Sequence, residues 1–143
     1  MIYTKLTKKA LLISFNAHKE QVDKSGMPYV YHPFHLAEQM DDEYSVCVAL
    51  LHDVVEDSDI TIEQLKSESF PDEITDALTL LTHNDDVPYL DYVRSIKNNR
   101  LASKVKLADL KHNSDLSRFE KTDAKAMQRV EKYKEAIRIL TQQ

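Results

Sequence analysis

Glycine, cysteine and long apolar runs are nearly missing from this 143-residue chain. With one glycine and no segment that alternates apolar and polar residues between turn signals, a β-sheet has little to build on, and we predict an all-α fold. Cys47 cannot form an internal disulfide and lies within VCVALL, which favours a core position in a reducing compartment. No apolar run approaches the roughly 20 residues that span a bilayer, so we expect a cytoplasmic protein without membrane contact.

Excess positive charge is also absent. The chain has 19 Lys and Arg residues against 24 Asp and Glu residues, a net charge of −5. Because nucleic acids are bound through a basic face, this balance argues against a nucleic-acid partner, although a small anion held through a metal stays possible. The length and the 42% hydrophobic content are typical of one globular domain, predicted over residues 1–143. Nothing in the sequence indicates the oligomeric state.

Apolar spacing and capping signals predict a succession of helices. A Thr61–Gln64 capping box and prolines that suit a first helical turn mark several starts. The basic residues after residue 120 alternate with acidic ones and are interpreted as the solvated face of the last helix. We predict helices over residues 4–22, 33–40, 43–57 and 123–141, and further starts at Thr61, Pro71 and Pro88.

The stretch VALLHDVVEDSD, residues 48–59, places titratable side chains within an apolar helix pattern. Burying an ionised carboxylate without a partner costs several kcal/mol or more, so such groups are normally paired or bound to a metal. His52 and Asp53 lie between two apolar pairs and can both reach one metal ion. Glu56 and Asp57 follow one turn later, close enough to orient a metal-bound water, although they also fit an ordinary acidic helix end.

Two other segments offer matching ligands. PYVYHPFHLAE contains His32 and His35, and VKLADLKHNSDL contains Asp109 with Asn113 on the same helical face. Taken singly, a histidine before a helix and an aspartate within one are more often capping or surface groups than ligands. Their joint occurrence with the His-Asp pair favours a metal site.

The order of His32, His52-Asp53 and Asp109 resembles the signature of HD-domain metal-dependent phosphohydrolases. More narrowly, DKSGMPYVYHP, ALLHDVVEDSDIT and KLADLKHNSDL resemble the hydrolase domain of RelA/SpoT homologues and the small alarmone hydrolases, over residues 17–118. The resemblance implies a single HD-domain helical bundle and one divalent ion, usually manganese. It also implies removal of the 3′-pyrophosphate from guanosine tetra- or pentaphosphate, the alarmones of the stringent response.

The resemblance assigns roles to individual residues. The implied metal ligands are His32, His52, Asp53 and Asp109. Glu56 and Asp57 match an acidic pair thought to activate and orient the attacking water. These mixed nitrogen and oxygen ligands leave room for water and a phosphate oxygen, which suits Mn²⁺ or Fe²⁺ better than a closed structural zinc site.

The remaining assignments concern a nucleotide substrate. Lys24 and Ser25 match a loop that contacts the substrate's phosphates, and Asn113 matches a residue that lines the nucleotide pocket. Lys106 would offset further phosphate charge, although an exposed helix lysine is an equally good reading. We expect a small-molecule nucleotide to be the partner.

Two departures from the resembled pattern affect the substrate more than the chemistry. Asp23 and Leu110 stand where the longer proteins often have arginine. One alternative is therefore an HD-domain nucleotidase or pyrophosphatase that acts on another phosphorylated nucleotide. A second alternative is a non-catalytic alarmone-binding module. The presence of Glu56 and Asp57 argues against it, because a protein that only binds its ligand needs no water-activating pair.

Overall fold

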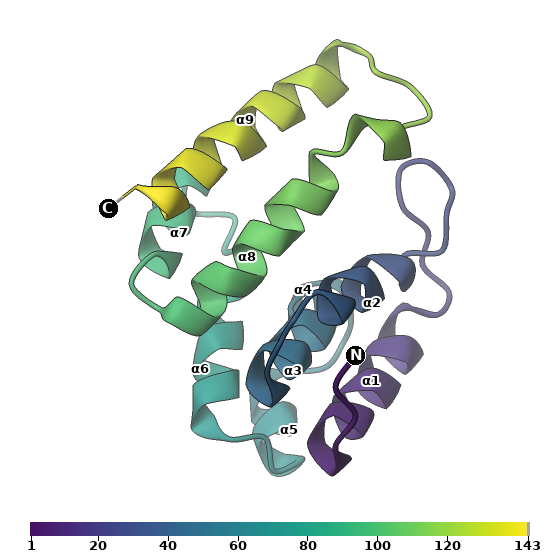
Figure 1. The fold of residues 1–143 in the computed structure, drawn as a ribbon, viewed down its shortest axis with the longest axis vertical. Helices are drawn as coiled ribbons and strands as arrows, with labels where there is room; N and C mark the ends of the chain where they lie inside the picture. The colour runs from purple at the N-terminus through teal and green to yellow at the C-terminus, as the bar shows by residue number, and fades with distance from the viewer. Residues whose placement is uncertain (143) are drawn as a thin grey trace.

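A computed structural model describes residues 1–142, which fold into helices without a β-strand (Figure 1). The predicted all-α class is confirmed. Within this part of the chain, no helix is both long and apolar enough to cross a membrane. The helices, in chain order, are α1 (Lys5–His18), α2 (Tyr31–Glu38), α3 (Glu43–Leu51), α4 (Val54–Asp57), α5 (Ile62–Ser67), α6 (Asp72–Leu81), α7 (Tyr89–Ile96), α8 (Arg100–Asn113), the 3₁₀ turn η1 (Leu116–Arg118) and α9 (Ala124–Thr141).

Local signals decide where several helices begin. The Thr61 hydroxyl oxygen accepts the backbone N–H of Gln64, and the Gln64 side-chain oxygen accepts the backbone N–H of Thr61, so the predicted capping box is present at the start of α5. Pro71 and Pro88 directly precede α6 and α7, as predicted. Gly26 has φ of +83°, a left-handed conformation that costs glycine little, in the loop between α1 and α2.

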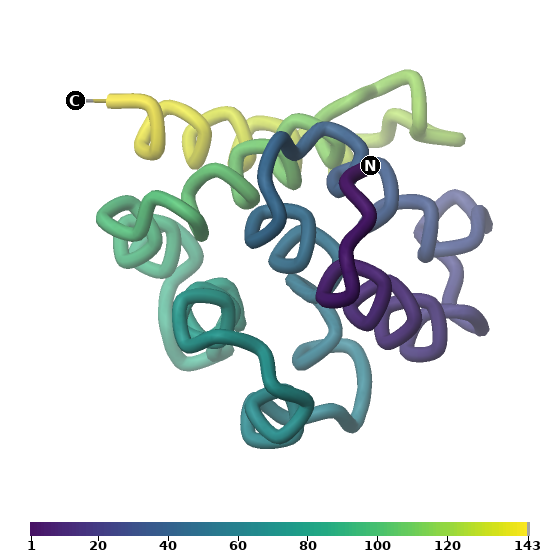
Figure 2. The backbone as a smooth tube through the Cα atoms, turned by 60° about the horizontal axis from the view of Figure 1, so that its bottom comes forward, coloured from purple at the N-terminus to yellow at the C-terminus, as the bar shows by residue number. Residues whose placement is uncertain are grey.

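The core is organised around α3, in which every residue from Ser45 to Leu51 is buried. Helices α1, α2, α6 and α8 pack against it. Figure 2 shows α3 enclosed in this way, with α9 lying along α8 on the outside of the bundle. Helix α3 therefore needs apolar residues on all its faces, which explains the run VCVALL.

The prediction of one helix over residues 43–57 is wrong at residues 52 and 53. Helix α3 ends at Leu51 and α4 begins at Val54, with Asp53 at φ −108° and ψ 0°. We attribute the break to tertiary contacts, because the His52 ring meets His32 on α2 and Asp109 on α8. The first predicted helix also ends early, at His18, and the second begins two residues before Pro33.

Candidate metal centre and adjoining pocket

Four side chains from distant parts of the sequence converge between α2, α3, α4 and α8. His32 lies in the first turn of α2, His52 and Asp53 lie in the break between α3 and α4, and Asp109 lies in α8. One potential ligand atom from each of the four lies within 4.8 Å of the others. The structure thus brings together the residues that the sequence predicts as metal ligands.

The hydrogen bonds of His52 show that these residues fit a cation. Its Nδ1 lies 2.7 Å from the carbonyl oxygen of Ala49 and can only donate to it. Its buried Nε2 has no partner of hydrogen-bond geometry within residues 1–142, yet lies 3.0 Å from Oδ2 of Asp53 and 3.5 Å from Oδ1 of Asp109. In a neutral ring, the lone pair of Nε2 would face two carboxylates, which is electrostatically unfavourable. A cation bound by all three groups would remove this repulsion.

The pKa values of His52 and Asp53 are consistent with this geometry. Burial alone would raise the pKa of Asp53, but the charge of His52 together with the contacts of His52 and Tyr29 lowers the pKa to about 2. Burial would likewise lower the pKa of His52, but the carboxylates of Asp53 and Asp109 together raise the pKa well above its usual value. Without a metal, a proton on Nε2 therefore supplies the positive charge that an ion would otherwise bring.

Asp109 is held by three other side chains. It accepts hydrogen bonds at 2.8 Å from Nε2 of His32, at 2.8 Å from Nζ of Lys106 and at 3.0 Å from Nδ2 of Asn113. Burial favours the neutral acid, but the Lys106 charge and these hydrogen bonds hold the pKa of Asp109 well below its usual range. The carboxylate is thus fixed in orientation and kept ionised, as a metal ligand requires.

Two residues outside the predicted site contact the candidate ligands. The Tyr29 hydroxyl donates to Oδ2 of Asp53. Nδ1 of His112 lies 2.7 Å from Nδ1 of His32, and the two rings are parallel within 3°. From the sequence, Tyr29 has the features of a packing residue and His112 has no assigned role. The only available signal is that each lies three residues from a ligand, His32 or Asp109.

Glu56 and Asp57 lie on α4, one turn beyond the break. Partial burial raises the pKa of both carboxyls, and the nearby charge of Asp53 raises them further. Glu56 Oε1 also accepts the backbone N–H of His83, which opposes the effect of burial and orients the group. A raised pKa makes each carboxylate a better proton acceptor near neutral pH.

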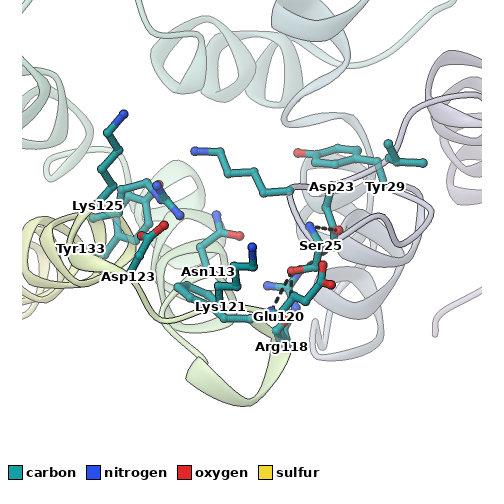
Figure 3. Close-up of a pocket in the computed structure, with 14 residues that line it drawn as sticks. Asp23, Ser25, Tyr29, Asn113, Arg118, Glu120, Lys121, Asp123, Lys125 and Tyr133 are labelled. Atoms are coloured by element: carbon teal, nitrogen blue, oxygen red, sulfur yellow. Dashed lines mark hydrogen bonds and ion pairs between the residues drawn. The ribbon is translucent and has the colours of Figure 1, made fainter.

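A pocket of about 690 Å³ lies between the α1–α2 loop, the end of α8 and α9 (Figure 3). Tyr29 and Asn113 line it and also bond to Asp53 and Asp109, so two side chains connect the pocket to the candidate metal centre, although none of the four candidate ligands lines it. The predicted substrate residues Lys24, Ser25 and Asn113 all line this pocket. The full lining is Val22, Asp23, Lys24, Ser25, Tyr29, Asn113, Arg118, Phe119, Glu120, Lys121, Asp123, Lys125, Arg129 and Tyr133.

Lys106 lies elsewhere, apart from the residues that line the pocket. Its ammonium bonds to Asp109 and lies over the rings of Tyr89 and Tyr92, 5.7 and 5.3 Å from their centroids. A direct contact of Lys106 with substrate stays a prediction. What the structure shows is a buried cation that orients a candidate ligand.

Four further cations, for which the sequence indicates no site, also line the pocket. They are Arg118, Lys121, Lys125 and Arg129. Figure 3 shows Lys125 and Tyr133 on the wall opposite Asp23, Ser25 and Tyr29. Part of the last helix's basic face is therefore a pocket wall, which the sequence alone could not reveal because it depends on how α9 packs on α8.

Parts of several longer known proteins are similar to this chain in sequence, and one solved structure is similar in fold. No family model matches the chain. A probable guanosine-3′,5′-bis(diphosphate) 3′-pyrophosphohydrolase of Synechocystis is 40% identical over 63 residues, 41% of this chain and 8% of that protein. The corresponding enzyme of Haemophilus influenzae is 44% identical over 61 residues, 40% of this chain and 9% of that protein. A probable GTP pyrophosphokinase of Mycobacterium leprae is 31% identical over 142 residues, 88% of this chain and 18% of that protein.

The resemblance to RelA/SpoT homologues is confirmed. The chain spans less than a fifth of the length of these relatives. A solved structure, described as a metazoan ortholog of SpoT that hydrolyses ppGpp and plays a role in starvation responses, aligns with a TM-score of 0.77. It covers 99% of this chain and 88% of its own at 23% identity, so this likeness supports the fold.

Proposed function

We propose that the chain is a metal-dependent phosphohydrolase that removes the 3′-pyrophosphate of guanosine 3′,5′-bis(diphosphate), yielding GDP and pyrophosphate. The observation that carries the proposal is the cluster of His32, His52, Asp53 and Asp109 beside two carboxyls of raised pKa. Partial sequence matches to proteins named for this activity support the choice of substrate.

We further propose that the cluster holds one Mn²⁺ ion. Two imidazole and two carboxylate ligands form a mixed set that does not close an octahedral shell, which suits Mn²⁺ better than a structural zinc. When bound, such an ion lowers the pKa of a coordinated water and offsets charge on the attacked phosphate. Tyr29 and Lys106 hold the carboxylates of Asp53 and Asp109 in place for it.

Other residues of the chain accept the proton and bind the substrate. Glu56 or Asp57 accepts the proton of the attacking water, because partial burial raises the pKa of both carboxyls. Lys24 binds phosphate oxygens through its charge, from the same pocket wall that carries Ser25. Asn113 joins the pocket to the centre, because it lines the pocket and bonds to Asp109.

The test is a panel of nucleotides incubated with the purified protein and Mn²⁺, with the products resolved by ion-exchange chromatography. We expect conversion of guanosine 3′,5′-bis(diphosphate) to GDP and pyrophosphate, and little phosphate release from GTP. Glu56→Gln should retain its metal and lose about 10²-fold or more in turnover, because it keeps the shape and removes the base. Glu63→Gln, at an exposed position on α5, is the matched control.

Three other outcomes would contradict parts of this proposal. A higher kcat/KM for nucleoside monophosphates than for the bis(diphosphate) would make the chain a general HD-domain nucleotidase. Tight binding of the bis(diphosphate) without turnover would indicate an alarmone-binding module. Activity of Glu56→Gln and Asp57→Asn within a few-fold of the parent would show that neither carboxyl is the proton acceptor.

A further inference from the structure

The loop of residues 21–29, which joins α1 to α2, is closed at its base and carries Lys24 and Ser25 into the pocket. The Tyr29 amide donates to the Gln21 carbonyl at 2.9 Å, and Val22 pairs with Pro28 as an isolated bridge. Gln21, three residues beyond the end of α1, thus lies at the base of this loop. Figure 1 shows the loop projecting from the bundle beside η1.

The side chain of Gln21 makes three hydrogen bonds. Its Nε2 donates to the carbonyl of Ala17 at 3.2 Å and to the carbonyl of Asp57 at 2.8 Å. Its Oε1 lies 2.8 Å from Nδ1 of the fully buried His18. Two carbonyl acceptors can face only the amide NH₂, so the orientation of the carboxamide is determined, and Nδ1 of His18 must carry the proton.

The bond to Asp57 joins the base of the loop to the last residue of the four-residue helix α4. Helix α4 is short enough that a carbonyl at its end has no intrahelical partner, so the Gln21 amide satisfies it. Tyr29, at the other end of the loop, donates to Asp53 at the start of α4. Both ends of the loop that lines the pocket are therefore bonded to the segment that bears Glu56 and Asp57.

We propose that Gln21 is a positioning residue for the reaction, which fixes the end of α4 and hence the Asp57 carboxylate against the substrate-binding loop. His18 supports this role by holding the Gln21 carboxamide in the orientation that donates to Asp57. The inference rests on the proposed function for its catalytic consequence, while the positioning itself is a property of the fold.

The test compares Gln21→Met with Gln39→Met. Methionine keeps the length of the side chain and removes its hydrogen bonds. Gln39 is a close control, because its Nε2 also donates to the carbonyl four residues earlier at 3.2 Å, but it is exposed and makes no bond to α4. We expect Gln21→Met to lower kcat about tenfold or more, with KM and metal content unchanged, and Gln39→Met to match the parent.

A second measurement does not depend on the substrate. The Asp57 amide donates to the Asp53 carbonyl at 3.0 Å, so its hydrogen exchange reports on opening of α4. We expect this exchange to be about fivefold or more faster in Gln21→Met and unchanged in Gln39→Met. Unchanged exchange, or faster exchange with an unchanged kcat, would overturn the inference. If the parent does not hydrolyse the bis(diphosphate), the proposed function fails, and the exchange rates alone decide whether Gln21 fixes α4.

Discussion

Binding of Mn²⁺ should stabilise the protein against heat by an amount that depends on Asp53. A ligand that binds only the folded state at 100 times its dissociation constant stabilises that state by about 2.7 kcal/mol. For 143 residues, an unfolding entropy of about 2 cal/mol/K per residue gives about 0.3 kcal/mol/K for the chain. The melting temperature should therefore rise by about 9 °C, as measured by circular dichroism on protein first treated with a chelator.

Asp53→Asn should abolish most of this shift. The substitution keeps the size of the side chain and an acceptor for the Tyr29 hydroxyl, but it removes the charge beside Nε2 of His52. We expect the rise to fall below about 2 °C at the same Mn²⁺ concentration. Asp91→Asn, at an exposed position on α7, removes the same charge and should keep the full shift. A full shift in Asp53→Asn, or none in the parent, would refute the assignment of the centre.

Three further outcomes follow from single residues. Lys24→Ala should raise KM for the bis(diphosphate) about tenfold in steady-state assays with kcat and metal content unchanged, because Lys24 lines the pocket and contacts no candidate ligand. Ser69→Gly should raise the free energy of unfolding by about 1 kcal/mol in urea titrations, because Ser69 has φ of +68°. In pH–rate profiles, activity should be lost as pH falls through an acid limb that lies above the usual pKa of the carboxyl concerned, because burial raises the pKa of the Glu56 and Asp57 carboxyls, which must be ionised to accept a proton.

Features with a local cause could be predicted from the sequence. The starts of α5, α6 and α7 depend on Thr61, Pro71 and Pro88 and their immediate neighbours, and all three are present. The bond from Asn113 to Asp109 likewise follows from a spacing of four residues on a helix. The convergence of the four candidate ligands was predicted from a resemblance, since no local rule brings residue 32 close to residue 109.

Features with a tertiary cause could not be predicted. Local patterning gives no reason to interrupt the apolar run at His52, and the break becomes intelligible only when α2 and α8 are in place. The position of Lys106 depends on Tyr89 and Tyr92 of α7, which the sequence does not connect to α8. The role of Arg129 as a pocket residue depends on the rotation of α9 against its neighbours.

The candidate ligands come from segments up to 77 residues apart, which has a kinetic consequence. A partly folded chain in which α2 has separated from α8 cannot hold His32 and Asp109 on the same ion. A bound ion would therefore stabilise the native state more than a transition state in which this contact is absent, and it would slow unfolding without speeding refolding. Resistance to proteases in the cell would then depend on metal supply through the lifetime of the folded chain.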